Sequence, residues 1–275
     1  MRAPFSAISA AMPGDLVHVF DAHKLTLSVG LLYSSLLVLA RIAGAMIFVP
    51  LPGLRSAPEQ VRVVLILAIT IALYPVWPLV PGNPTIADFA AWLAVESAFG
   101  LAIGLLVGFL SEAGLIFGQL CGLQAGFSMA STIDPESQAD APVLSAIAQS
   151  VSGLLFVTLG LHRYIIRLFA ESLTTQPPTK LVLNPRWGEM VVHAAGSIFS
   201  VGLRLALPIV GLMLMVDLTL ALLGRINSQL QLIHLAMPLK IMAALATISI
   251  LLMLFPSVYS DYANRMFRVA VAMAR

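Results

Sequence analysis

Charged side chains are scarce in this sequence. Only 10% of its 275 residues are Asp, Glu, Lys or Arg, whereas an ordinary globular domain has about 25%. A soluble chain with so few charges could not cover its surface, and 59% of the residues are hydrophobic. The composition excludes an ordinary soluble domain and indicates a helical membrane protein, or one buried to a similar degree among partners.

Residues suited to chemistry are also few. Cys121 is the single cysteine, which excludes an internal disulfide and a Cys-based metal site. The five histidines are scattered without metal-ligand spacing, and the sequence has no HExxH, P-loop or dinucleotide motif. The stretch GFSM around Ser128 is similar to the serine motif of intramembrane proteases, but no glycine follows the serine. We therefore expect no enzyme activity, cofactor or metal, and the net charge of +2 indicates no nucleic-acid surface.

Long apolar runs are what the sequence has instead. Four runs lack any charge and approach the ~20 residues that cross a hydrocarbon core: Val63–Val80, Ala113–Ile133, Ala141–Leu161 and Ile241–Ser260. Three more are interrupted by one or two charges: Leu25–Pro50, Phe89–Leu110 and Met190–Gly224. The pattern predicts an all-α membrane-type fold of about six to seven hydrophobic helices. We expect an N-terminal tail over residues 1–24, a helical domain over 25–260 and a C-terminal tail over 261–275.

Glycines recur at a spacing of four residues in two successive ladders. The first is Gly100, Gly104 and Gly108, bracketed in the same register by Glu96 and Glu112; the second is Gly114, Gly118, Gly122 and Gly126. On a helix such stripes let backbones approach closely in an apolar environment. Two interpretations stay open: ordinary packing of membrane helices, or a helix hairpin packed repeatedly against similar neighbours in a wound oligomer.

A few charges interrupt or border the apolar runs, namely Arg41, Glu96, Arg204, Asp217 and Lys240. Each costs about 2.5–3.5 kcal/mol at a lipid-facing helix centre on insertion scales, so we expect them to face protein or water. Arg204 and Asp217 would lie on roughly opposite faces of one helix and cannot pair with each other. Each then needs a partner on another helix or chain, although Lys240 could also reach the membrane surface by snorkelling.

Three stretches carry a family resemblance: ARIAGAMIFVPLPGLRSAPEQVRVVLILAITIALYP, CGLQAGFSMASTIDPESQADAPVLSAI and ALPIVGLMLMVDLTLALLGRINSQLQLIHLAMPLKIM. In order and spacing they resemble the FliR family of flagellar export-gate proteins and their injectisome counterparts, the SctT/YscT-like subunits. The similarity runs from about Leu36 to Pro256. One departure is the loop at Ser228–Gln231, where family members tend to have Pro and Asn at the first and last positions.

The resemblance implies a subunit that joins FliP-like and FliQ-like subunits in a gated pore for unfolded flagellar proteins, with FlhA-like and FlhB-like partners, in the inner membrane at the flagellar basal body. It also implies a loop that plugs the closed pore, about Gly122 to Pro135 here. The plug residues would be Gly122, Gln124, Gly126, Phe127, Met129, Ile133, Asp134 and Pro135. Without the resemblance, this segment is a helix end followed by a turn at Asp134-Pro135. An injectisome subunit and a small-solute secondary transporter are the alternative functions.

Overall fold

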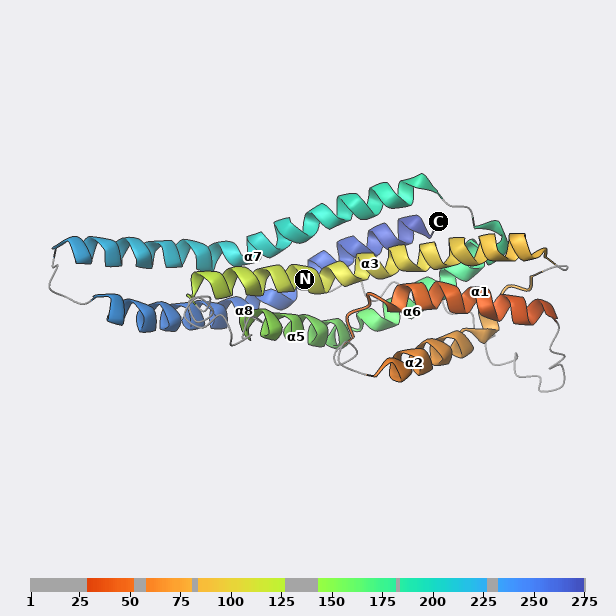
Figure 1. The fold of residues 1–275 in the computed structure, drawn as a ribbon, viewed down its shortest axis with the longest axis horizontal. Helices are drawn as coiled ribbons and strands as arrows, with labels where there is room; N and C mark the ends of the chain where they lie inside the picture. Colours follow the sequence, from red (N-terminus) through yellow and green to blue (C-terminus); the bar gives the residue numbers. More distant parts are fainter. Residues whose placement is uncertain are drawn as a thin grey trace, which may run out of the picture.

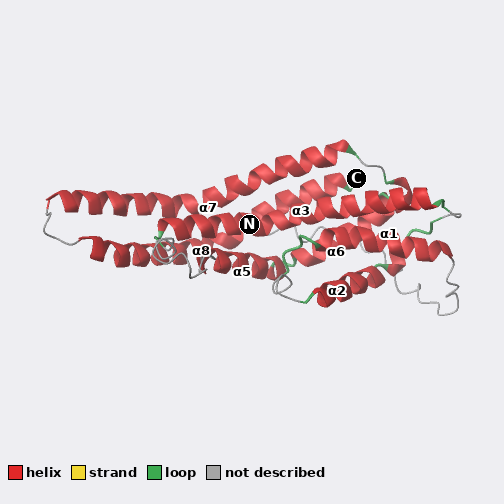
Figure 2. Ribbon diagram, in the orientation of Figure 1, coloured by secondary structure: helices red, strands yellow, loops and turns green. Residues whose placement is uncertain are grey.

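The computed structural model describes residues 29–51, 58–80, 84–126, 143–181, 184–226 and 232–274. Within these ranges the chain forms seven α-helices and no strand (Figure 2), which confirms the predicted all-α fold. The helices are α1 (Val29–Met46), α2 (Glu59–Ala72), α3 (Ile86–Gln124), α5 (Val143–Thr158), α6 (Leu161–Thr175), α7 (Pro185–Ile226) and α8 (Leu232–Met273). Two short 3₁₀ turns, η2 (Tyr74–Val76) and η3 (Pro178–Lys180), lie in the connections.

The helix boundaries differ from the boundaries of the apolar runs. The runs on either side of Glu112 form the single helix α3, whereas the run Ala141–Leu161 is divided at Gly160, which adopts a φ of +70° between α5 and α6. These two helices are bent by 60° relative to each other. The expected boundary at residue 260 falls inside α8, which continues to Met273. The N-terminal tail expected over residues 1–24 lies outside the described residues.

The long helix α3 is the centre of the packing. It contacts α1, α5, α7 and α8, and Figure 1 shows it running along the middle of an elongated bundle. Its N-terminus is capped by Thr85, whose Oγ1 accepts a hydrogen bond from the backbone N–H of Asp88 at 3.2 Å. Aromatic pairs join it to two neighbours, Phe99 with Trp187 on α7 and Phe117 with Phe255 on α8.

Helix α6 is amphipathic and lies with its apolar face inward. The buried positions follow helical spacing, namely Leu161, Ile165, Leu168, Phe169, Ser172 and Leu173. Arg163, Arg167 and Glu171 are exposed on the other side. This pattern places one small polar side chain, Ser172, in an otherwise apolar interface.

Helices α7 and α8 form a hairpin that extends beyond the C-terminal end of α3 (Figure 1). Among the described residues, three helices are long and apolar enough to cross a membrane: α3, α7 and α8, or four if the bent pair α5–α6 counts as one span. The most apolar window of α3 is 61% buried within the chain, but those of α7 and α8 are only 22% and 17% buried. The hairpin therefore presents most of its apolar surface outward.

Candidate functional site

A buried ion pair and the hydrogen bonds around it join three helices, α1, α3 and α6. Arg41 on α1 and Glu96 on α3 are both fully buried, and Arg41 Nε donates to Glu96 Oε2 at 2.5 Å while a second guanidinium nitrogen donates to Glu96 Oε1 at 3.0 Å. The guanidinium also donates to the Ser172 hydroxyl at 2.9 Å and to the backbone carbonyl of Gln176 at 3.0 Å. It lies 5.0 Å from the centre of the Phe99 ring.

This network satisfies both charges inside the chain. The two parallel hydrogen bonds to the carboxylate are the bidentate geometry that Arg forms best. The Ser172 hydroxyl accepts from Arg41 and donates to the carbonyl of Phe169 at 2.9 Å. Removing either ion would leave the other buried without its counter-charge, which costs about 3–5 kcal/mol in proteins. The pair therefore fixes α1, α3 and α6 relative to one another.

The first glycine ladder is the contact surface of α3 for α1. A Cβ atom on Gly100 would overlap the carbonyl oxygen of Arg41, and one on Gly104 would lie 2.7 Å from the Cα of Ala45. At the end of the ladder, a Cβ atom on Gly108 would lie 3.0 Å from the backbone oxygen of Phe48. Because the atoms in the way are backbone, these positions set how closely the two helices approach. Glu96 continues the same face one turn earlier, and so meets Arg41.

The second ladder begins as the contact surface of α3 for α5. A Cβ atom on Gly114 would overlap the hydroxyl oxygen of Ser152, and one on Gly118 would lie 2.5 Å from the Cα of Ser145. Thus α1 and α5 use successive parts of one helix, and the close approaches are made within the chain. This packing accounts for the glycine spacing from Gly100 to Gly118 without a second subunit. Glu112, between the two ladders, is half-buried.

The described part of the expected plug is the C-terminal end of α3. Gly122 is buried, Gln124 is the last helical residue and half-buried, and Gly126 has a φ of +83°. The N–H of Ala125 and that of Gly126 donate to the carbonyls of Cys121 and Leu123. The other expected plug residues lie outside the described residues: Phe127, Met129, Ile133, Asp134 and Pro135.

The remaining intrahelical charges lie on the α7–α8 hairpin. Lys240 on α8 forms an ion pair with Asp217 on α7 at 2.6 Å, and their side chains are 21% and 49% exposed. Arg204 is exposed in the middle of α7 and forms no ion pair with any residue that the structure describes. Of the expected intrahelical cations, Arg41 and Lys240 thus find their counter-ions within this chain.

Sequence analysis missed the neutral members of the Arg41 network. Neither Ser172 nor Gln176 was identified as functional, because neither belongs to a charged or glycine-rich motif. A signal was nevertheless present, since Ser172 is the only polar residue on the buried face of α6. A lone small polar group on such a face indicates a hydrogen-bonded partner across the interface.

These features define the class of protein: an all-α membrane-type protein built around a central glycine-lined helix. Residues 32–266 match the family described as "Bacterial export proteins, family 1". The flagellar biosynthetic protein FliR of Escherichia coli is 33% identical over 217 residues, which cover 78% of this chain and 82% of that protein.

Two further relatives have the same name. FliR of Pectobacterium carotovorum is 30% identical over 80% of this chain and 82% of its own length, and FliR of Aquifex aeolicus is 25% identical over 86% and 92%. The chain belongs to the FliR family, as the sequence motifs predicted. It is therefore a membrane component of flagellar protein export.

Proposed function

We propose that this chain assembles with FliP-like and FliQ-like membrane subunits into a gated pore through which unfolded flagellar proteins leave the cell. The pore would lie in the inner membrane at the flagellar basal body and work with FlhA-like and FlhB-like partners. The observation that carries this proposal is Arg204, an exposed cation without a counter-ion among the described residues, in the middle of a membrane-length helix.

A partner chain satisfies Arg204 better than lipid does. A cation at the centre of a lipid-facing helix costs about 2.5–3.5 kcal/mol on insertion scales. Pro208 lies one turn further along α7 and has no N–H to donate to the carbonyl of Arg204. The same turn therefore presents a cation and a carbonyl oxygen that lacks its usual helical donor. A neighbouring helix that carries a carboxylate and a hydroxyl or amide would satisfy both groups.

The surroundings of Arg204 also favour a protein partner. Exposed apolar side chains cover the outer half of the hairpin: Leu207, Leu212, Leu214, Met215, Leu218 and Leu222 on α7, and Leu239, Met242, Leu245, Ile250 and Met253 on α8. Such a surface would pack against other apolar helices as well as against acyl chains. Because Arg204 has no counter-ion among the described residues, this surface favours a protein partner over acyl chains, which would leave the charge without one.

The test is recovery of the complex from membranes that contain an affinity-tagged chain. Arg204→Leu and Arg204→Glu should abolish co-purification of the FliP-like and FliQ-like subunits, while Arg204→Lys should retain part of it. Arg225→Gln, which removes an exposed cation at the far end of α7, is the control and should leave recovery unchanged. Normal recovery with Arg204→Glu would overturn the assembly role.

We further propose that the segment from Gly122 to Pro135 closes the pore. What supports this is its position: it begins in the last turn of the central helix, just before Gly126 adopts a left-handed conformation that glycine reaches without strain. Phe127, Met129 and Ile133 can exclude water and ions from a narrow lumen, since hydrophobic constrictions gate by dewetting.

Deletion of residues 127–133 should make membranes that contain the assembled complex leak small ions. Replacing Phe127, Met129 and Ile133 together by serine keeps the length and should also produce a leak. Both variants are compared at equal recovery of the complex. Unchanged conductance in both would exclude the plug.

The relatives reported above are flagellar proteins, which favours a flagellar over an injectisome role. Membership of an export family is likewise at odds with a small-solute transporter. No feature of the described residues specifically favours an injectisome subunit or a small-solute transporter.

A further inference from the structure

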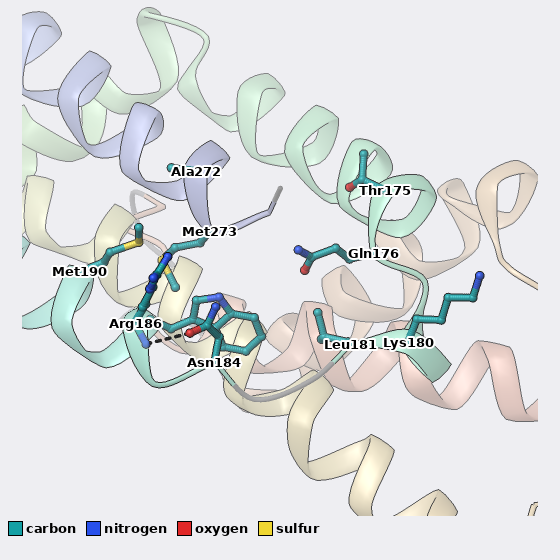
Figure 3. A pocket seen from close by; sticks show the side chains of 10 residues that line it. Thr175, Gln176, Lys180, Leu181, Asn184, Arg186, Met190, Ala272 and Met273 are labelled. Atoms are coloured by element: carbon teal, nitrogen blue, oxygen red, sulfur yellow. Dashed lines mark hydrogen bonds between the residues drawn. The ribbon is translucent and has the colours of Figure 1, made fainter.

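Two adjacent cavities form one cleft where α6 ends, α7 begins and α8 ends. The first has a volume of about 440 Å³ and the second about 770 Å³. Both are lined by Met190 on α7 and Ala272 on α8, so the two cavities adjoin at these residues. Figure 3 shows the first cavity, with polar side chains from the end of α6 and the start of α7, and with the apolar Ala272 and Met273 from the end of α8.

The first cavity is cationic and has an unsatisfied hydrogen-bonding group. Lys180 and Arg186 line it, with no carboxylate among its lining residues. Asn184 caps α7 there, its Oδ1 accepting from the backbone N–H of Arg186 at 3.0 Å. The side-chain oxygen of Gln176 is buried without a hydrogen-bond donor among the described residues, and Figure 3 shows this amide extending into the cavity.

The second cavity has an apolar floor and a charged rim. Met190, Ala194, Met266 and Val269 form the floor. The charged and imidazole side chains of the rim are, among the described residues, Arg265, Arg268, His193 and one carboxylate, Glu189. With Lys180 and Arg186, the cleft thus has four Lys and Arg side chains against one acidic side chain.

The cleft lies where charged residues give way to apolar ones along two helices able to span a membrane. Beyond it, α7 has no charged residue from Ala194 to Leu203, and α8 has none from Ile241 to Ser260. A boundary of this kind is the depth at which lipid headgroups meet acyl chains. Basic pockets at helix ends are suited to anionic headgroups.

We propose that this cleft binds an anionic phospholipid with a hydroxylated headgroup, of the phosphatidylglycerol type. The phosphate lies between Lys180 and Arg186, a headgroup hydroxyl donates to the side-chain oxygen of Gln176, and an acyl chain follows the apolar floor. An acidic peptide would match the cations but would not use a floor that leads onto the membrane-spanning part of α7 and α8. The proposal does not depend on the export function.

One contact connects this cleft to the centre of the fold. The backbone carbonyl of Gln176 accepts a hydrogen bond from Arg41, while its side chain reaches into the cleft. A lipid bound there would restrain the residue that holds α6 against the buried ion pair. Lipid binding is therefore expected to raise the thermal stability of the chain.

The experiment is native mass spectrometry of the purified full chain, released from detergent after incubation with dioleoyl lipids. Phosphatidylglycerol should form adducts at about tenfold lower concentration than phosphatidylcholine. Both lipids have the phosphate, but phosphatidylcholine adds a quaternary ammonium, which the cations of the cleft repel, and it has no hydroxyl to donate to Gln176. Loss of one such hydrogen bond is on the order of a factor of ten in affinity. The double variant Lys180→Gln/Arg186→Gln should lose this preference. Arg225→Gln removes a cation at the opposite end of α7 and should keep it.

Two further variants locate the lipid. Ala272→Trp fills the shared part of the cleft at an exposed position without changing charge, and should reduce phosphatidylglycerol adducts. Gln176→Met removes the acceptor for the headgroup hydroxyl and should weaken phosphatidylglycerol binding without abolishing it. Elution in gel filtration checks that each variant is folded. Equal adducts with phosphatidylglycerol and phosphatidylcholine, or a preference unchanged by the double variant and by Ala272→Trp, would overturn the proposal.

Discussion

Replacing Gly100 by alanine is expected to destabilise the protein more than almost any other single added methyl group. The new Cβ atom would overlap the carbonyl oxygen of Arg41 and lie 2.8 Å from its carbonyl carbon. Ordinary contacts of this kind need about 3.4 Å or more, and the obstacle is the backbone of α1, which cannot rotate away. Helix α1 must therefore shift, and the shift also strains the hydrogen bonds between Arg41 and Glu96.

The expected cost follows from overpacking. Extra methylenes forced into a packed core cost about 1–3 kcal/mol, and alanine returns about 1 kcal/mol through its better helix propensity. Because backbone has to move, we expect a net loss near 2 kcal/mol. For a chain of this size each kcal/mol corresponds to about 2–4 °C in melting temperature.

Two other glycines calibrate the measurement. Gly114→Ala meets the Ser152 hydroxyl, a side-chain atom that can rotate, so its cost should be smaller. Gly211→Ala has nothing within 4 Å of the new Cβ and should be neutral or stabilising. The assay is the apparent melting temperature in detergent, from the loss of the monodisperse gel-filtration peak after heating. A Gly100→Ala protein as stable as Gly211→Ala would refute the idea that α1 and α3 are in backbone contact there.

Two further predictions concern the ion pairs. Glu96→Gln should lower the apparent stability by about 3 kcal/mol, because Arg41 is then buried without its counter-charge. The double variant Arg41→Met/Glu96→Met should recover much of this stability, because no buried charge is left alone. The measurement is the melting temperature of both variants, and a double variant less stable than the single one would contradict the prediction. Lys240→Met should change the apparent stability by less than about 1 kcal/mol, since its pair with Asp217 is partly exposed; a loss as large as that of Glu96→Gln would show that this pair is buried more deeply than the isolated chain indicates.

The sequence predicted the fold class and the family, and it located the charged and glycine positions, but it misplaced the ends of helices. Apolar runs were divided at charges, yet Glu112 sits half-buried within α3 and does not interrupt it. Conversely, Gly160 lies in an uncharged run and ends a helix through its positive φ. A backbone conformation of this kind has no hydropathy signal.

The C-terminal segment shows the same limitation. Residues after Ser260 were separated from the helical domain because charges reappear there. In the structure Arg265 and Arg268 are exposed while Tyr262, Met266 and Ala270 are buried, so the helix continues as an amphipathic one. Periodicity, rather than mean hydropathy, was the informative signal.

The pairing of Arg41 with Glu96 could have been inferred only from the register of two helices. Both residues were identified as charges that need partners, but nothing in the sequence specifies that α1 lies along the first glycine ladder. Once that contact is known, Glu96 follows one turn before Gly100 on the same face. The alignment of α1 along α3 therefore determines which charged residues pair, and the sequence alone does not specify it.

The three-helix network around Arg41 has a consequence for how the chain is made. Arg41 and Glu96 leave the ribosome well before Ser172 and Gln176, since synthesis proceeds from the N-terminus. While the chain is inserted, the Arg41 guanidinium and the Glu96 carboxylate can pair with each other, but two N–H groups of Arg41 still lack acceptors. These acceptors, the Ser172 hydroxyl and the Gln176 carbonyl, arrive only with α6. Nascent chains arrested before residue 172 would therefore hold an incompletely hydrogen-bonded arginine, whose contacts with an insertase could be detected by crosslinking.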